Sequence, residues 1–331
     1  MTKQTWNLAL ALSLLGLALI PSTSLAQVGL WTKGPGKNPA SSAAQAASHQ
    51  TRTPGAPSYS FTLLSFPGSG LDTGVSGLNP GATTSKIDVV GGYTAADGEQ
   101  AGFLTHVSGT KTVKETYEAV NYPHEPTGQY AVDINDSGQI VGSYQDGSGV
   151  WHGYELSGGK FTTIDVPFAN ATYTFPEAIN NSGEIVGVWG NNGDATGFTL
   201  IDGTYTSIEY PGASYTFLEG VNSQGDIVGI YLNANGEQGF LLSGGTYTSI
   251  EVPGAVTTEA IGLNDSGVIV GDYYPNQTNL AEGFVLSGGV FTTIAIPGEP
   301  YTVLFSINDN GVILGTYEDA AGLSVGFLAT P

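Results

Sequence analysis

The segment VNSQGDIVGIYLNANGEQGFLLSGGTYTSIEVPG, which runs from Val221 to Gly254, contains the pattern that decides the fold. Its apolar residues come in short runs rich in Val, Ile, Tyr, Phe and Thr, separated by Asn, Ser and Gly, which is typical of strands and turns. No window has the apolar period of about 3.6 residues that marks a helix. With the preceding run 215–218, the segment predicts four consecutive strands in about 43 residues, the pattern of one β-propeller blade.

Three markers of this unit recur six times along the chain, as expected for a repeat protein. The first is an Asn before a glycine-containing turn, degraded at Asn79 and then clear at Asn135, Asn180, Asn222, Asn264 and Asn308. The second is a glycine with an aromatic residue two positions later, at Gly91, Gly142, Gly187, Gly229, Gly271 and Gly315. We expect these glycines to lie where neighbouring blades approach closely, with the aromatic residues packed between the blades. The third is a Gly-aromatic pair that ends in Phe103, Tyr154, Phe198, Phe240, Phe284 and Phe327.

The last repeat ends at Pro331, before its fourth strand begins, and the run Phe61 to Pro67 near the start of the chain matches that fourth-strand pattern. We therefore predict an all-β fold over residues 59–331, a six-bladed β-propeller of four-stranded antiparallel blades. In this prediction the N-terminal strand, at 59–67, pairs with 326–330 and completes the last blade, so that no sheet edge is left open.

One repeat shows the unit clearly: Ile134-Asn135, then Ile140 to Tyr144, then His152-Gly-Tyr154, then Phe161 to Pro167. These segments resemble the HAF-repeat family of predicted extracellular bacterial proteins. The resemblance covers about residues 59–331 and implies secretion and a repeat architecture, with no established activity. The other repeats replace His152 by a different residue, which argues against a His-dependent function in every repeat.

Residues 1–26 have Lys3 near the start, an apolar run from Leu8 to Ile20, and small residues up to Ala26. This pattern predicts a signal peptide cleaved near Ala26 and a secreted or periplasmic protein. Residues 27–58 are poor in large apolar side chains and are expected to form a disordered leader. The chain has no Cys, so its stability cannot depend on disulfide bonds.

From residue 59 onward the chain has four Lys, no Arg and 29 Asp or Glu, a formal charge of 4 − 29 = −25. No Lys, Arg or His occurs after Lys160. Such a surface repels phosphate backbones and anionic membranes, which argues against nucleic-acid binding and membrane insertion. We expect a monomer whose partner is a neutral glycan or a surface protein.

In repeat rings the binding surface usually lies on the face with variable loops. On that face, matched positions of adjacent repeats place Glu177, Glu219 and nearby Glu259 toward the central channel, with Tyr173 and Tyr215 close by. Trp151 and His152, beside the variable loop 145–151, complete the predicted ligand-binding residues. Carboxylates with aromatic rings suit a neutral sugar or a cation. The alternative is that these acids recur through repeat duplication and are solvated surface groups.

No arrangement of residues identifies a catalytic or metal site. The stretch Asp133 to Gly138 fits only the first half of a calcium loop and favours a turn, and His124-Glu125 lacks the second His of a zinc helix. We therefore predict no cofactor, no metal and no catalytic residues. The function expected is a secreted glycan-binding module; the alternatives are a protein-interaction scaffold and, third, a glycosidase or lyase that uses Glu177 and Glu219.

Overall fold

The computed structural model describes part of the chain. It describes residues 59–64, 73–83, 86–94, 100–108, 114–123, 126–191, 194–275, 280–296, 298–299, 301–319, 322 and 324–331. The regular elements within these ranges are all strands, and no helix among them is long and apolar enough to cross a membrane. The predicted signal peptide and leader lie outside the described residues.

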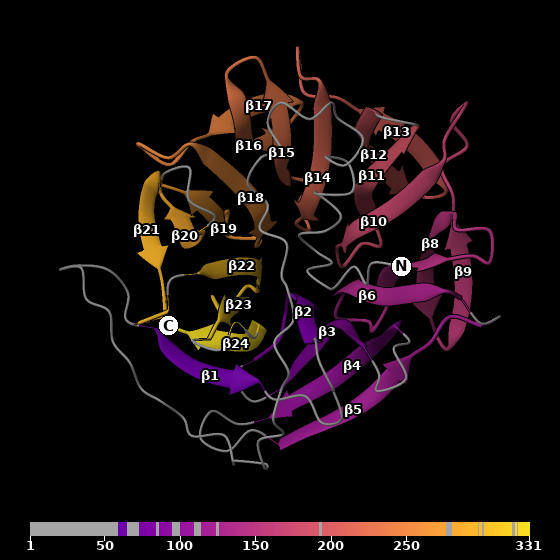
Figure 1. Cartoon of the computed structure of the whole chain (residues 1–331), viewed down its shortest axis with the longest axis horizontal. Coiled ribbons are helices and arrows are strands. Elements are labelled where there is room, and N and C mark those ends of the chain that lie inside the picture. Colours follow the sequence, from indigo (N-terminus) through magenta and orange to yellow (C-terminus); the bar gives the residue numbers. More distant parts are fainter. Residues whose placement is uncertain are drawn as a thin grey trace.

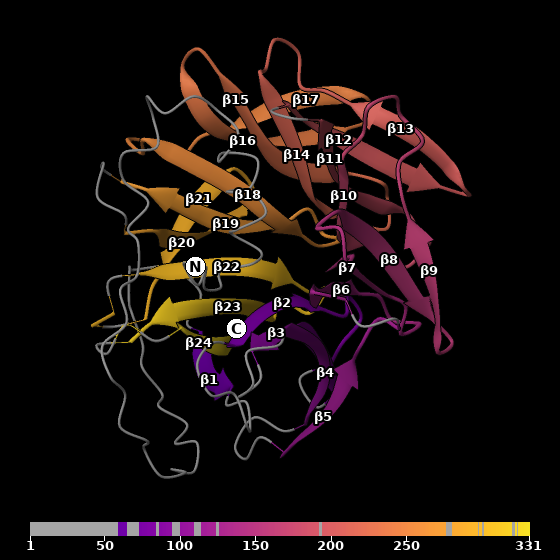
Figure 2. The same ribbon diagram turned by 45° about the vertical axis from the view of Figure 1, so that its right-hand side comes forward.

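The strands form a β-propeller arrangement, with sheets around a common centre (Figure 1; turned by 45° in Figure 2). Four sheets have four antiparallel strands each. The first three are β2 (Thr73–Leu78), β3 (Ile87–Thr94), β4 (Gln100–Ser108), β5 (Lys114–Val120); β14 (Tyr215–Val221), β15 (Ile227–Asn233), β16 (Gly236–Ser243), β17 (Thr246–Ile250); and β18 (Thr257–Leu263), β19 (Ile269–Tyr274), β20 (Glu282–Ser287), β21 (Val290–Ile294). The fourth is β22 (Thr302–Ile307), β23 (Ile313–Glu318), β24 (Ser324–Thr330), β1 (Ser60–Leu64).

The other eight strands belong to one sheet, which corrects the prediction of six separate four-stranded blades. They are β6 (Gly128–Ile134), β7 (Ile140–Gln145), β8 (Trp151–Ser157), β9 (Lys160–Ile164), β10 (Tyr173–Ile179), β11 (Ile185–Asn191), β12 (Asp194–Ile201) and β13 (Thr204–Ile208). The sheet is continuous because β10 and β8 meet in a parallel pair at Tyr173 and Trp151. On either side of this junction the strands are antiparallel, as predicted for two repeats.

The predicted pairing of the N-terminal strand with the end of the chain is confirmed. Strand β1 pairs antiparallel with β24 from Ser60 opposite Thr330 to Leu64 opposite Gly326. Phe61 is 7% exposed and meets Phe327 edge to face, with ring centroids 5.5 Å apart. Strand β1 is therefore a packed part of its sheet and covers the outer edge of β24.

Each repeat Asn shapes its own turn and also reaches the next repeat. The side-chain oxygen of Asn222 accepts hydrogen bonds from the backbone N–H groups of Gln224 (3.1 Å) and Asp226 (2.9 Å). Its side-chain nitrogen donates to a backbone carbonyl of the following repeat, and so do the equivalent nitrogens. These bonds run from Asn135 to Asn180, from Asn180 to Asn222, from Asn222 to Asn264, from Asn264 to Asn308, and from Asn308 to Ala82. We call this series the asparagine chain.

We predicted that six glycines, Gly91, Gly142, Gly187, Gly229, Gly271 and Gly315, lie where neighbouring blades meet. That prediction is wrong. A Cβ on Gly229 would overlap the carbonyl of Phe217 and touch the ring of Phe240, both in its own sheet. The close approach between sheets occurs at the third marker, where a Cβ on Gly239 would lie 3.0 Å from the Cβ of Ala260.

The aromatic residues two positions after these glycines do pack between repeats, as predicted. Tyr231 stacks on Tyr210, which follows β13, with ring centroids 3.6 Å apart and planes at 6°. Tyr144 stacks in the same way on Tyr122 at 3.7 Å, and Trp189 packs against Phe168 at 4.8 Å. Tyr231 is only 3% exposed, so its role is structural.

Replacing Tyr231 with Ala should lower the free energy of unfolding by about 3 kcal/mol, because it removes a buried ring from between two sheets. Urea denaturation measures the change. The control is Val290→Ala, since Val290 is 65% exposed and its loss should cost less than about 0.5 kcal/mol. A similarly small loss for Tyr231→Ala would show that the ring contributes little packing.

Candidate functional site

Glu177 and Glu219 owe their orientation to a β-bulge. In β10 the register with β11 shifts between Pro176 and Ala178, which leaves Glu177 as the extra residue. The register of β14 with β15 shifts in the same way around Glu219. The other innermost strands have the same irregularity, and a bulge turns its extra side chain away from the regular alternation of a strand.

Both side chains line a cavity of about 60 Å³ that is bounded by residues of β2, β6, β10, β14, β18 and β22. These are the strands nearest the centre in Figure 1, so we call it the axial cavity. Its lining continues into the turns of the asparagine chain, including Asn180, Asn222 and Asn264. A cavity of this volume holds a few water molecules, whereas small-molecule sites usually begin at about 300 Å³.

Glu177 is the most deeply buried acid of the axial cavity, whereas Asp309 is exposed and the other acids are half-buried. Glu177 is 6% exposed, and burial and then the charge of Glu219 raise the pKa of Glu177 well above its ordinary value. Burial raises the pKa of Glu219 to about 7 and that of Asp133 also to about 7. Because Glu177 is buried, it is not a solvated surface group, which was the alternative that the sequence left open.

Glu259 lies in a different environment. It pairs across strands with Asp272, is 8% exposed, and is not among the residues that line the axial cavity. Burial, then the charges of Asp272 and Glu237, raise its pKa well above the ordinary value. The matching positions of the two preceding repeats hold Phe175 and Phe217, so this acidic pair replaces what is an apolar contact elsewhere.

The predicted tyrosines are used in packing. Tyr215 is 5% exposed, and its hydroxyl donates a hydrogen bond to the carboxylate of Glu237. The hydroxyl of Tyr173 donates to the carbonyl of Asp194 at 3.3 Å. Trp151 packs between Tyr130 and Phe175, with ring centroids 5.6 Å from each. These rings are therefore not open platforms for a ligand.

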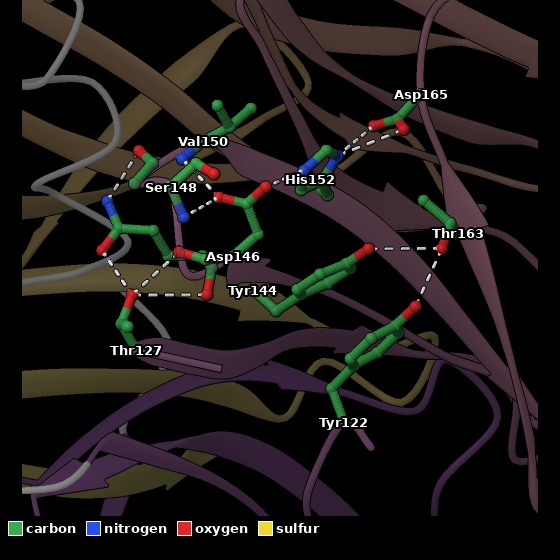
Figure 3. Close-up of polar contacts among 11 residues, drawn as sticks. Tyr122, Thr127, Tyr144, Asp146, Ser148, Val150, His152, Thr163 and Asp165 are labelled. Carbon is green, nitrogen blue, oxygen red and sulfur yellow. Dashed lines mark hydrogen bonds and ion pairs between the residues drawn. The ribbon is translucent and has the colours of Figure 1, made fainter. Parts of the chain in front are cut away.

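His152 is the predicted residue with the most accessible polar surroundings (Figure 3). Its Nδ1 lies 2.9 Å from a carboxylate oxygen of Asp165, and its Nε2 lies 3.5 Å from Asp146. The side chains of His152, Asp146 and Asp165 are 22%, 37% and 52% exposed. The imidazole stacks on Tyr144, with centroids 5.1 Å apart.

A threonine hydroxyl joins this group to the neighbouring repeat. The hydroxyl of Thr163 lies 2.8 Å from that of Tyr122 and 3.3 Å from that of Tyr144. We call Tyr144, Asp146, His152, Thr163 and Asp165 the His152 cluster; Figure 3 shows its polar groups gathered beside the turn after β7. The backbone N–H of Val150 lowers the pKa of Asp146, so this exposed carboxylate stays ionised.

Related groups recur at the equivalent place in two later repeats. The hydroxyl of Tyr231 lies 2.9 Å from that of Ser249, which donates to Glu251 at 2.8 Å. Tyr273 lies 2.9 Å from Thr293 and donates to Glu282 at 2.6 Å. Asp146, Asp165 and Glu237 were not predicted as site residues from the sequence. Asp165 could have been found, since it falls within the repeated fourth-strand motif that ends at Pro167.

Comparison with known proteins identifies the fold. No family model matches the sequence, and no curated protein matches it. AofleA from Arthrobotrys oligospora has a TM-score of 0.52 at 12% identity, over 86% of this chain and 90% of that chain. Aleuria aurantia lectin, solved with α-methyl-L-fucoside, has a TM-score of 0.51 at 11% identity, over 77% of this chain and 91% of that chain.

A Trypanosoma rangeli sialidase has a TM-score of 0.49 at 9% identity, over 84% of this chain. The chain spans only 60% of the length of that sialidase. At such identities, the likeness to solved structures shows the fold alone.

Proposed function

We propose that this chain is a non-catalytic binding module for a neutral glycan, and that the His152 cluster is its contact site. The observation that carries the proposal is the grouping of two partly exposed carboxylates, an imidazole and hydroxyl groups beside a tyrosine ring. Carboxylates accept hydrogen bonds from sugar hydroxyls, and the imidazole and the hydroxyl groups add further polar partners. The fold that the chain shares with a lectin solved with α-methyl-L-fucoside supports this choice of ligand class.

The same proposal includes the finer architecture. The junction of β8 and β10 is a single residue pair, so we infer that the eight-stranded sheet acts as two blades of a six-bladed ring. The asparagine chain passes from Asn308 to Ala82, which supports closure of this ring between its last and first repeats. We also infer kinship with HAF-repeat proteins and export from the cell after removal of residues 1–26.

The size of the axial cavity argues against the enzyme alternative. Glu177 and Glu219 face a cavity of about 60 Å³, which does not admit a sugar ring between the two carboxyl groups. A glycosidase needs its two acids on either side of a bound glycosidic link. The protein-interaction scaffold remains the second candidate, supported by the loops of unequal length between the second and third strands of the repeats.

The test is glycan-array binding of the protein with residues 1–26 removed, followed by calorimetric titration with the glycan that binds, and with α-methyl-L-fucoside. We expect Asp165→Asn and His152→Ala each to weaken binding at least about tenfold, since each loses a polar contact. The matched control is Asp202→Asn in the exposed turn between β12 and β13, where φ is 48° and Asn is well tolerated. Absence of binding to any glycan, or equal binding by all variants, would contradict the proposal.

A further inference from the structure

The axial cavity concentrates negative charge without any compensating base. Its lining includes five acidic residues: Asp133, Glu177, Glu219, Asp265 and Asp309. Among the described residues, no Lys, Arg or His lines it, and none occurs in the sequence after Lys160. The inner strands β10, β14, β18 and β22 therefore contain no positively charged side chain. A confined space that is lined by acids and lacks a compensating base attracts cations.

Three of these acids are already satisfied by the backbone. Asp133 accepts a hydrogen bond from the N–H of Ile179 at 2.9 Å. Asp265 accepts from Ser223 at 2.8 Å, and Asp309 accepts from the N–H of Asp265 at 3.0 Å. These bonds hold the turns of adjacent repeats together, so these three carboxylates have a structural role.

Glu177 differs from them. Its Oε1 is fully buried and, within the described part of the chain, has no hydrogen-bond partner. Leaving such an oxygen unpaired is unfavourable, and more so if the carboxyl group is charged. A β-bulge in β10 places Glu177 on the cavity, and the matching bulge in the adjacent inner strand, β14, places Glu219 there. Two acids directed to the same small space, one of them unpaired, indicate that something absent from the protein itself completes the site.

We propose that the axial cavity binds a divalent cation of the calcium class, held by the carboxylates of Glu177 and Glu219. Calcium prefers oxygen ligands and accepts six to eight of them in flexible geometry, including backbone carbonyl groups and water. Within the described ranges, no three acidic, His or Cys side chains already surround a single point. The cation therefore keeps part of its water shell, for which a cavity of about 60 Å³ has room.

Protons are the competing occupant. Burial raises the pKa of both carboxyl groups, so protons compete with a cation for them. Calcium must displace these protons, so its binding releases them and weakens as the pH falls. A site for protons alone would show neither saturable calcium binding nor coupled proton release.

The experiment is calorimetric titration of the protein lacking residues 1–26 with calcium chloride at pH 7, after treatment with a chelator, in buffers of different ionisation enthalpy. We expect one saturable site per chain, release of protons on binding, and a higher melting temperature with calcium. The double variant Glu177→Gln, Glu219→Gln should bind calcium at least about 100-fold more weakly. The control Asp202→Asn removes one exposed acid that does not line the axial cavity, and it should bind calcium as the parent does.

Absence of calcium binding by the parent protein, or equal binding by the double variant, would each overturn the proposal. If the double variant does not fold, the single variant Glu177→Gln replaces it and should also weaken calcium binding. Glycan binding is measured separately, so failure at the axial cavity leaves the role of the His152 cluster unaffected.

Discussion

Removing β1 should lower the free energy of unfolding by about 5 kcal/mol or more and promote association between molecules. Phe61 and Leu64 are 7% and 4% exposed. Phe61 belongs to the same hydrophobic cluster as Phe327, and Leu64 belongs to a second cluster that includes Leu328. Truncating a buried Phe costs about 3 to 5 kcal/mol and a buried Leu about 2 to 5. The deletion also exposes the edge of β24, which would present unpaired backbone groups to other chains.

The measurement compares thermal melting and light scattering of two truncated proteins. One lacks residues 27–58 and should behave as the parent, whereas the other lacks 27–66 and should melt at a lower temperature and associate. Phe61→Ala, with an expected loss of about 3 kcal/mol, provides a soluble intermediate if the longer truncation precipitates. Equal stability of the two truncated proteins would refute a structural role for β1.

The second large effect concerns pH. Well below pH 3.8, Asp133 and Glu219 are protonated in both the folded and the unfolded chain. The ordinary pKa is 3.8 for Asp133 and 4.5 for Glu219, and folding raises both to about 7. At a pH between the ordinary and the raised values, only the folded chain keeps these protons. The folded state then binds more protons than the unfolded state, so stability falls as pH rises through this range and levels off above about pH 7. For Glu219, the free energy of unfolding falls by roughly 3 kcal/mol over this pH range.

Urea denaturation from pH 4.5 to pH 8.5, with a chelator present, tests this dependence. Glu219→Gln should flatten part of the profile and should be more stable than the parent at pH 8 by roughly 2 to 3 kcal/mol, because a neutral amide replaces a confined charge. The control Asp202→Asn should keep the slope of the parent. A profile whose stability rises between pH 5 and pH 7, or an unchanged slope in Glu219→Gln, would be incompatible with raised pKa values at this cavity.

The strands were predictable because every repeat has the same order of apolar runs and glycine-containing turns. In the segment from Val221 to Gly254, turns at Asn222 and Ser243 separate apolar runs, and the structure has β15, β16 and β17 there. The pairing of β1 with β24 was also predictable, from a missing fourth strand at one end of the chain and a surplus one at the other. Local patterns were sufficient in both cases.

The site was less predictable because it depends on registers and contacts between repeats. A strict two-residue alternation cannot show that Glu177 is the extra residue of a bulge, nor that Glu259 faces Asp272 instead of the cavity. The glycine assignments failed for a similar reason. The partner of Gly229 is the carbonyl of Phe217 in its own sheet, and sequence spacing does not reveal carbonyl directions. His152 was identified, but Asp165 joins it only through the pairing of β8 with β9.

The asparagine chain also constrains how such a protein can change its length. In an open solenoid each unit contacts only its neighbours, so a unit can be gained or lost at an end with little adjustment elsewhere. Here the amide of Asn308 donates to Ala82, 226 residues earlier, so the last unit takes its partner from the first. In the closed ring that we propose, insertion or loss of one unit would alter the angle between neighbouring units at each of these hydrogen bonds. Gene duplication can supply further copies of this repeat, but adding one would require the geometry of all the turns in the asparagine chain to change together.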